Sequence, residues 1–200
     1  MNAAWDAPAA AFETLAATYQ GRRFNSPNDV AQRSNGDFYF TDPPYGLEGG
    51  VTDPAKELDF HGVYRLATDG LLTLLTDQLS RPNGIAFSPD ESILYVSNSD
   101  GQNQPVIMAY PVRPDGTLGE GRVFFESWGD GMAVDQRGNV YVGGPGNGVF
   151  IISPQGEHLG TLRTTQRTSN CAFGDDGSTL YITADMHLVR VRLNVKGVGF

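Results

Sequence analysis

Four short polar residues recur along this chain, each just before a run of small and apolar residues. Asn28, Asn83, Asp130 and Asn170 occur in Ser-Pro-Asn-Asp-Val, Arg-Pro-Asn-Gly-Ile, Gly-Asp-Gly-Met-Ala and Ser-Asn-Cys-Ala. Amide and carboxylate oxygens are hard ligands that suit calcium or magnesium better than copper. Asp130, the only carboxylate of the four, can also act as a general base toward water. If the fold brings these side chains together, the pattern predicts a divalent-cation site with hydrolytic chemistry.

The four polar residues are 55, 47 and 40 positions apart, and each is followed by a turn and an aromatic strand. A period of about 40 to 50 residues with several short strands per unit is typical of a β-propeller. The innermost strand of a propeller blade starts at the central channel, so a polar residue at that start points into the channel. The sequence therefore predicts an all-β fold, a β-propeller, with these residues lining its channel.

About four repeats of up to four strands are predicted, and a single domain spans residues 1–200. The expected strands are 28–31, 38–41, 62–67 and 71–76; 84–88, 94–98, 106–112 and 122–126; 131–134, 140–143, 149–153 and 158–162; and 171–174, 180–183 and 188–193. One further strand is expected over 12–17, with a helix as the alternative there. Residues 1–10 show no periodicity and are expected to be poorly ordered.

The fourth repeat has no fourth strand. Residues 12–17 could supply it and close a four-bladed ring, or the chain could be an open part of a larger ring. An open ring leaves unpaired strand edges, through which copies of the chain can associate. The sequence leaves both arrangements open.

The composition excludes several classes of partner. The net charge is −9, with 23 acidic residues against 14 Lys and Arg, which argues against nucleic-acid binding because phosphate contacts need basic side chains. No apolar run approaches the roughly 20 residues that a membrane span needs. Cys171 is the only cysteine, so no internal disulfide can form, and it is expected to be buried. We expect a cytoplasmic protein; the periplasm or secretion stays open, because a signal would lie upstream.

Several motifs occur in the order found in the gluconolactonase family, also called the SMP-30/regucalcin-like family. They are Ser-Pro-Asn-Asp-Val, Phe-Thr-Asp-Pro-Pro-Tyr-Gly, Arg-Pro-Asn-Gly-Ile-Ala-Phe-Ser-Pro-Asp and Asp-Gly-Met-Ala-Val-Asp. The chain resembles that family over residues 12–195. The resemblance implies a six-bladed propeller, of which about four blades are present here and the N-terminal ones are missing. It also implies hydrolysis of sugar lactones such as glucono-1,5-lactone.

The resemblance further implies one divalent metal in the channel, usually Ca²⁺, with Zn²⁺, Mn²⁺ and Mg²⁺ as alternatives. By position, Asn83 and Asp130 match two metal ligands. Asn28 matches a channel residue that contacts the metal or the substrate. In this interpretation the metal polarises the lactone carbonyl and activates a water molecule, with Asp130 as the base.

Four other residues are expected at the site. Asp42, in Thr-Asp-Pro-Pro-Tyr-Gly, matches an acidic residue that some relatives place beside the metal or use in catalysis. Asn170 matches a position that lines the channel and is expected to contact the substrate. Tyr45 and Trp128 flank the proposed channel mouth and could stack on a sugar.

Two departures from the family pattern bear on these expectations. Family members have a longer N-terminal part that carries a metal-binding Glu, and no residue here replaces it by position. Some relatives have an Arg where this chain has Ser26, so that Arg22 or Arg23 would have to substitute. Two alternatives therefore stay open: a non-catalytic propeller fragment that binds calcium or a partner, and a related calcium-propeller esterase.

Overall fold

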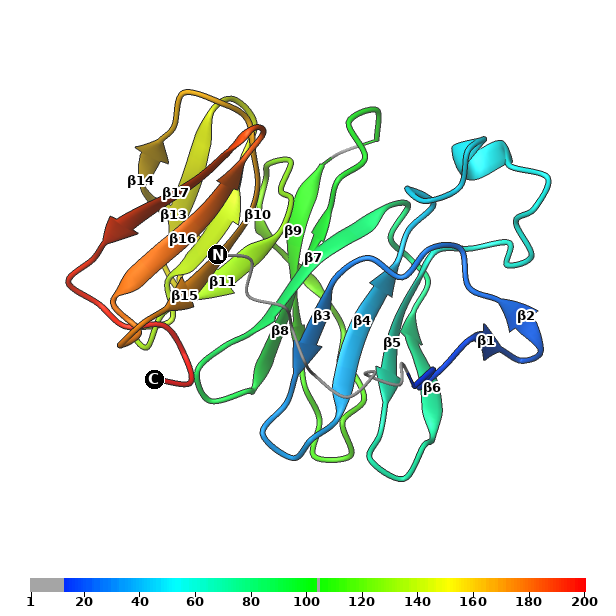
Figure 1. Ribbon diagram of the computed structural model, residues 1–200. Coiled ribbons are helices and arrows are strands. Elements are labelled where there is room, and N and C mark those ends of the chain that lie inside the picture. The colour runs from blue at the N-terminus through cyan, green and yellow to red at the C-terminus, as the bar shows by residue number, and fades with distance from the viewer. Residues whose placement is uncertain (1–12, 104) are drawn as a thin grey trace, which may run out of the picture.

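The computed structural model describes residues 13–103 and 105–200, so the expected disorder of 1–10 lies outside it. Four antiparallel sheets, the blades of a β-propeller, fan out side by side and are joined by short connections (Figure 1). The predicted all-β propeller fold is confirmed. No helix in the described residues is long and apolar enough to cross a membrane.

Each blade is a chain-ordered antiparallel sheet. Blade one contains β3 (Val30–Gln32), β4 (Phe38–Asp42), β5 (Gly62–Leu66) and β6 (Leu72–Thr76). Blade two contains β7 (Pro82–Phe87), β8 (Ile93–Asn98), β9 (Val106–Pro111) and β10 (Arg122–Phe125). Blade three contains β11 (Met132–Val134), β12 (Val140–Gly143), β13 (Gly148–Ile152) and β14 (His158–Arg163), and blade four contains β15 (Thr168–Gly174), β16 (Thr179–Ala184) and β17 (His187–Arg192). The long loop between β4 and β5 contains one turn of 3₁₀ helix, Gly50–Thr52.

Aspartates set the hairpin turns between these strands. Asp69, Asp115, Asp135 and Asp176 each accept a hydrogen bond from the backbone N–H two residues ahead. Such Asp side chains hold the chain in a turn by a local bond that needs no tertiary partner. This local chemistry explains why the strand boundaries could be predicted to within a few residues.

The cores lie between the blades. Tyr39 of blade one packs edge-to-face on Phe87 of blade two, with ring centroids 4.9 Å apart. Tyr141 of blade three and the buried Cys171 of blade four belong to another such cluster. Burial confirms the expectation for Cys171 and raises the pKa of its thiol to about 12. Alternate residues of each strand thus face neighbouring blades, which fixes how the blades sit beside one another.

The prediction for residues 12–17 is wrong in the described residues. Residues 13–17 form no strand; a two-residue hairpin follows instead, β1 (Thr18–Tyr19) paired with β2 (Arg22–Arg23). Tyr19 packs edge-to-face on Tyr64 of blade one, with ring centroids 5.3 Å apart, so aromatic contact holds this segment on blade one.

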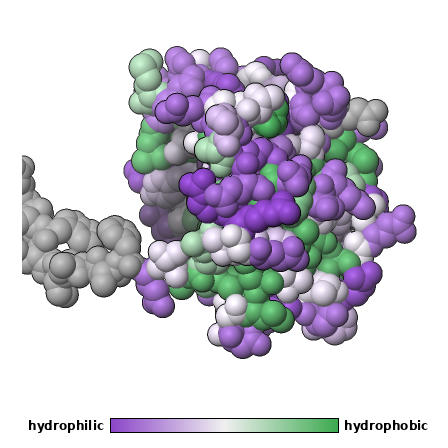
Figure 2. All heavy atoms as spheres, turned by 90° about the vertical axis from the view of Figure 1, so that its right-hand side faces the viewer, coloured by the Kyte–Doolittle hydropathy of each residue, from purple (hydrophilic) through white to green (hydrophobic). Residues whose placement is uncertain are grey.

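The four-bladed closure is therefore not formed. The hairpin lies beside blade one, at the opposite end of the fan from β17 (Figure 1). Among the described strands, β17 pairs only with β16. Viewed from the blade-one end, the molecule shows apolar patches between hydrophilic residues (Figure 2). Within residues 13–103 and 105–200, no strand pairing closes the fan into a ring.

Candidate functional site

One pocket forms where the inner strands of the blades begin. Its volume is about 440 Å³, and it contains four of the residues expected from the sequence together with Trp128. The lining residues are Asn28, Tyr45, Arg81, Asn83, Ser99, Gly101, Trp128, Asp130 and Arg167.

Asn28, Asn83 and Asp130 are in direct contact, although they belong to three different repeats. Asn28 Nδ2 donates to Asn83 Oδ1 at 2.6 Å, and Asn83 Nδ2 donates to Asp130 Oδ1 at 3.0 Å. Asn83 Nδ2 is also 3.0 Å from the hydroxyl of Ser99, which in turn donates to the Gly129 carbonyl. The structure thus brings the three expected metal-site residues together in a continuous line.

The buried Asn83 holds this line in place. Only 5% of its surface is exposed, and its carbonyl accepts a hydrogen bond from Thr41 Oγ1 of blade one at 2.8 Å. The register of β7 shifts between Pro82 and Ile85, which breaks the regular strand pairing at Asn83 and Gly84. A Cβ at Gly84 would lie 2.1 Å from the Asp130 carbonyl oxygen, so glycine permits blades two and three to meet here.

Asp130 sits at the junction of blades three and four. Its backbone N–H donates to the Gly143 carbonyl at 2.8 Å, and the N–H of Gly131 donates to the Ser169 carbonyl at 2.8 Å. Burial raises the pKa of the Asp130 carboxyl, while the hydrogen bond from Asn83 and the charge of Arg167 act in the opposite direction. The net shift is upward.

Asp29, next to Asn28, has a structural role. Its Oδ1 accepts the N–H of Val30 and its Oδ2 accepts the N–H of Ile85 in blade two, at 2.9 and 3.1 Å. It thereby ties blade one to blade two directly beneath Asn28. Burial raises the pKa of this carboxyl.

Aromatic and basic side chains surround the rim of the pocket. The guanidinium of Arg167 lies 5.0 Å from the centre of the Trp128 ring, in a cation–π contact. Tyr45 keeps 44% of its surface exposed. The sequence reasoning missed Arg81 and Arg167, although a signal was present: Arg81 occupies the position of Ser26 relative to the inner-strand Asn, and Arg167 comes three residues before Asn170.

Asp42 does not line the pocket, which corrects the expectation that it acts beside the metal. It is fully buried, and its Oδ2 accepts hydrogen bonds from both the backbone and the side-chain nitrogen of Asn25, each at 2.9 Å. Its Oδ1 accepts the N–H of Ser26 at 2.7 Å. The carboxylate is therefore engaged in fixing the segment that leads into Asn28.

Asn170 does not line the pocket either. Its Oδ1 accepts the N–H of the next residue, Cys171, at 2.8 Å, a local bond typical of a turn residue. The side chain lies against Gly131, where an added Cβ would approach it to 2.1 Å. Asn170 thus packs against Gly131, next to Asp130, and is not among the residues that line the pocket.

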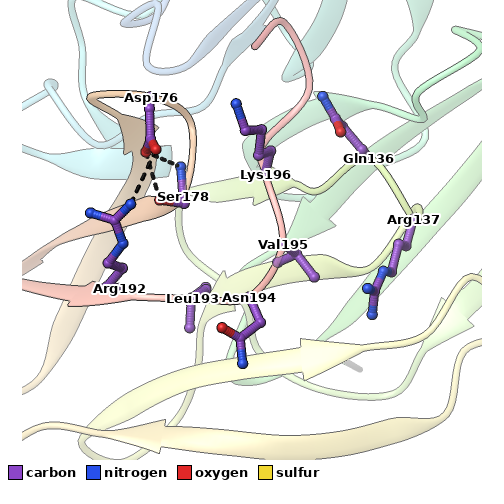
Figure 3. A pocket seen from close by; sticks show the side chains of 9 residues that line it. All are labelled: Gln136, Arg137, Asp176, Ser178, Arg192, Leu193, Asn194, Val195 and Lys196. Carbon is purple, nitrogen blue, oxygen red and sulfur yellow. Dashed lines mark hydrogen bonds and ion pairs between the residues drawn. The ribbon is translucent and has the colours of Figure 1, made fainter.

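A second pocket of about 430 Å³ lies at the other end of the blades, beside the C-terminal segment 193–196 (Figure 3). Its only carboxylate, Asp176, is already engaged by Ser178 and by Arg192, whose guanidinium is 3.1 Å away. It therefore offers no free carboxylate for chemistry. The candidate site is the Asn28–Asn83–Asp130 pocket, because that pocket contains the residues that the sequence pattern singled out.

The donor set fits a hard divalent cation. No group of three or more His, Cys, Asp or Glu side chains is placed to hold a metal within the described residues. The pocket instead offers one carboxylate and two amides in mutual contact. Oxygen-only sets of this kind suit Ca²⁺, Mg²⁺ or Mn²⁺, which accept water and substrate as further ligands.

Comparison with known proteins shows the family of the chain. The model of the SMP-30/gluconolactonase/LRE-like region matches residues 2–185. The chain belongs to this family. The resemblance seen in the sequence motifs is thereby confirmed, and the match runs from blade one to the end of β16 in blade four.

Individual members of the family show how much of their length this chain represents. A gluconolactonase of Zymomonas mobilis is 44% identical over 193 residues, which cover 90% of this chain and 53% of that protein. The lactonohydrolase oryL of Aspergillus oryzae is 27% identical, with 92% and 48% covered. The solved structure of a gluconolactonase from Xanthomonas campestris superposes with a TM-score of 0.80 at 37% identity, with 89% and 60% covered. The chain thus spans about half of the length of the curated relatives it matches.

Proposed function

We propose that this chain carries the channel site of a hydrolase that acts on sugar lactones such as glucono-1,5-lactone. The observation that carries the proposal is the hydrogen-bonded line from Asn28 through Asn83 to Asp130, which opens into a pocket with aromatic side chains on its rim. The names of the family members above, gluconolactonase and lactonohydrolase, support it.

Asp130 acts as the general base in this proposal. The amide of Asn83 holds Oδ1, and Oδ2 accepts no hydrogen bond among the described residues, so it is available to a water molecule. Burial raises the pKa of Asp130 from its ordinary value, and a carboxylate of higher pKa is a stronger base. Asp130 therefore withdraws the proton as the water attacks the lactone carbonyl carbon.

Asn83, Asp130 and Asn28 would also hold the divalent cation, with Ca²⁺ as the expected ion and Zn²⁺, Mn²⁺ or Mg²⁺ as alternatives. Such an ion supplies polarisation of the carbonyl and lowers the pKa of bound water. The chain's own contribution is a set of oxygen-bearing side chains from three blades with one side open, because Asn28 is exposed while Asn83 is buried. Asn83 Oδ1 accepts the hydrogen bond from Asn28 Nδ2, so a cation that binds Asn83 would replace that bond.

Substrate binding falls to the rim of the pocket. Tyr45 and Trp128 offer flat apolar surfaces against which the C–H face of a sugar ring packs. Asn28, exposed at the pocket, is placed to hydrogen-bond ring hydroxyl groups. Such contacts orient the lactone so that its carbonyl carbon faces Asp130.

The test is hydrolysis of glucono-1,5-lactone, followed by acid release, with added calcium and with a chelator. We expect calcium-dependent turnover that Asp130→Asn abolishes. Asp185→Asn is the matched control, because Asp185 lies in an exposed turn at φ 46°, a conformation that Asn also adopts. Full turnover by Asp130→Asn would contradict the proposal.

A non-catalytic calcium-binding role is the second candidate. In this role the side chains of the Asn28–Asn83–Asp130 line would bind the ion, and water would fill its remaining positions, since calcium takes six to eight ligands. Thermal stabilisation by calcium without turnover of any lactone would support it. Hydrolysis of phenyl acetate but not of lactones would instead support a related esterase.

The open ends of the fan favour association of two copies. At one end β17 has a free edge with Leu188 71% exposed, and at the other end the face shows apolar patches (Figure 2). Unpaired strand edges of this kind accept a strand from another chain. We infer that the chain self-associates through its ends as its concentration rises.

A further inference from the structure

Two guanidinium groups line the candidate pocket, those of Arg81 and Arg167. With Asp130 they are the only charged side chains among its lining residues, so the lining carries a net positive charge. The whole chain has a net charge of −9. A local positive charge in an acidic protein attracts anions to this pocket.

Arg167 is held in place without using its hydrogen-bond donors. Its guanidinium lies over the Trp128 ring at 5.0 Å, and it forms no ion pair among the described residues. The group is close enough to Asp130 to lower the pKa of that carboxyl, but it is not bonded to it. The N–H groups along the edge of the guanidinium are therefore available to a ligand.

Arg81 is in the same situation on another blade. It directly precedes β7, lines the pocket beside Asn83, and forms no ion pair in the described part of the chain. Its charge contributes to lowering the pKa of Asp100 nearby. Two unpaired guanidinium groups thus face one cavity.

A guanidinium presents paired N–H donors that match the oxygens of a carboxylate or a phosphate, whereas neutral sugar hydroxyls need no such partner. We propose that Arg81 and Arg167 bind an anionic group on the ring substituent of the substrate, so that the pocket selects carboxylated or phosphorylated sugar lactones over neutral ones. This inference rests on the proposed lactone hydrolysis and names its substrate class.

The first experiment measures binding and needs no turnover. Trp128 becomes the only tryptophan in a Trp5→Phe background, so its fluorescence reports ligands near Arg167. The ligands are glucitol (neutral), gluconate, glucarate (one carboxylate more) and 6-phosphogluconate (one phosphate more). We expect glucarate or 6-phosphogluconate to bind about tenfold more tightly than gluconate, and glucitol most weakly. Comparison of the affinities for glucarate and for 6-phosphogluconate tells whether the pocket prefers a carboxylate or a phosphate.

Variants assign the preference to the two arginines. Arg167→Gln and Arg81→Gln each remove most of it, and Arg167→Lys retains part of it. Arg137→Gln is the matched control, because it removes an exposed positive charge at the other end of the blades and leaves binding unchanged. Equal affinity for gluconate and the more anionic ligands, no binding of any of them, or a preference that survives both Gln variants would overturn the inference.

Steady-state kinetics with anionic and neutral lactones separate this inference from the proposed function. We expect the chain to prefer 6-phosphoglucono-1,5-lactone or glucaro-1,4-lactone to glucono-1,5-lactone, with about tenfold higher kcat/KM that arises in KM. In Arg167→Gln, the ratio of kcat/KM for the anionic lactone to kcat/KM for the neutral lactone falls toward one. Absence of turnover with every lactone contradicts the proposed function, while the fluorescence titration still decides the anion site. Faster turnover of the neutral lactone contradicts the inference alone.

Discussion

Asn83 Nδ2 lies 3.0 Å from Asp130 Oδ1, although the two residues are 47 positions apart and belong to different sheets. This bond joins blade two to blade three at the bottom of the pocket. It leaves the second carboxylate oxygen of Asp130 free, which is the arrangement that a base needs. The predictions below test what this arrangement does.

Asp130→Asn removes the proposed base and is expected to lower lactone hydrolysis at least a hundredfold. The fold should survive at pH 7. Because the folded-state pKa of Asp130 is raised, its contribution to stability is greatest below the unfolded pKa and declines as pH rises through the folded one. A neutral Asn therefore costs little near neutrality. Circular dichroism melts and initial rates, compared with Asp185→Asn, check both parts.

The pH dependence of hydrolysis follows from the same carboxyl. Asp130 works as a base only when ionised, so kcat/KM should fall as pH drops through a pKa above the ordinary 3.8. The charge of Arg167 lowers that pKa, so Arg167→Gln should move the acid limb of the profile to higher pH. Arg137→Gln should leave the limb in place. An acid limb that stays unmoved in Arg167→Gln would remove Asp130 as its origin.

Calcium should raise the melting temperature if the three oxygens hold it. Calcium at a hundred times its Kd stabilises the folded state by about 2.7 kcal/mol. Asn28→Ala is the informative variant, because Asn28 is exposed and its loss should leave the calcium-free melting temperature nearly unchanged. We expect the calcium-dependent shift to shrink in Asn28→Ala and in Asp130→Asn. An undiminished shift in both would place the calcium elsewhere.

Asp42 is predicted to matter for stability and not for chemistry. Asp42→Ala leaves the buried backbone N–H of Asn25 without its acceptor, along with the N–H of Ser26, and should cost about 2–3 kcal/mol. Asp77→Ala, which removes an exposed carboxylate that accepts no hydrogen bond in the described residues, is the control. Urea denaturation gives the difference. Activity per folded molecule should persist in Asp42→Ala; its complete loss would restore a catalytic role.

Self-association can be read from molar mass. Light scattering after size exclusion should show a mass that rises with protein concentration. Leu188→Glu places a charge on the exposed edge strand β17 and should hold the chain as a monomer. Val51→Glu is the matched control, because Val51 is 48% exposed and lies in the 3₁₀ turn of the β4–β5 loop, outside any strand. A constant monomer mass for the unaltered chain would contradict the inference.

Local chemistry made the strands predictable. Aspartates such as Asp135 and Asp176 hold their turns by bonds to residues two positions ahead, and the alternation of apolar residues marks the strands between them. The repeat of a polar residue before each inner strand was visible for the same reason, and so was the burial of Cys171. These features depend on neighbours in the sequence, so the sequence determined them by itself.

The contents of the pocket were decided only by packing between blades. Asp42 and Asn170 carry the expected side chains, yet one is enclosed by the N–H groups of Asn25 and Ser26 and the other bonds to its own neighbour, Cys171. Arg167, by contrast, was not expected at the site, and it lies there because its guanidinium stacks on the ring of Trp128 from another segment. Which way a side chain points depends on groups that are tens of residues away, and no local pattern records them.

The position of the N-terminal segment was decided in the same way. The sequence left open whether this segment joins an edge of blade four or leaves the ring unclosed. In the described residues the ring is unclosed, and the segment forms a hairpin whose Tyr19 packs on Tyr64. Residue types thus determined the blades and the kinds of donor atom available. The tertiary structure decided which donors meet, because contacts between blades depend on aromatic burial and close backbone approach across separate sheets.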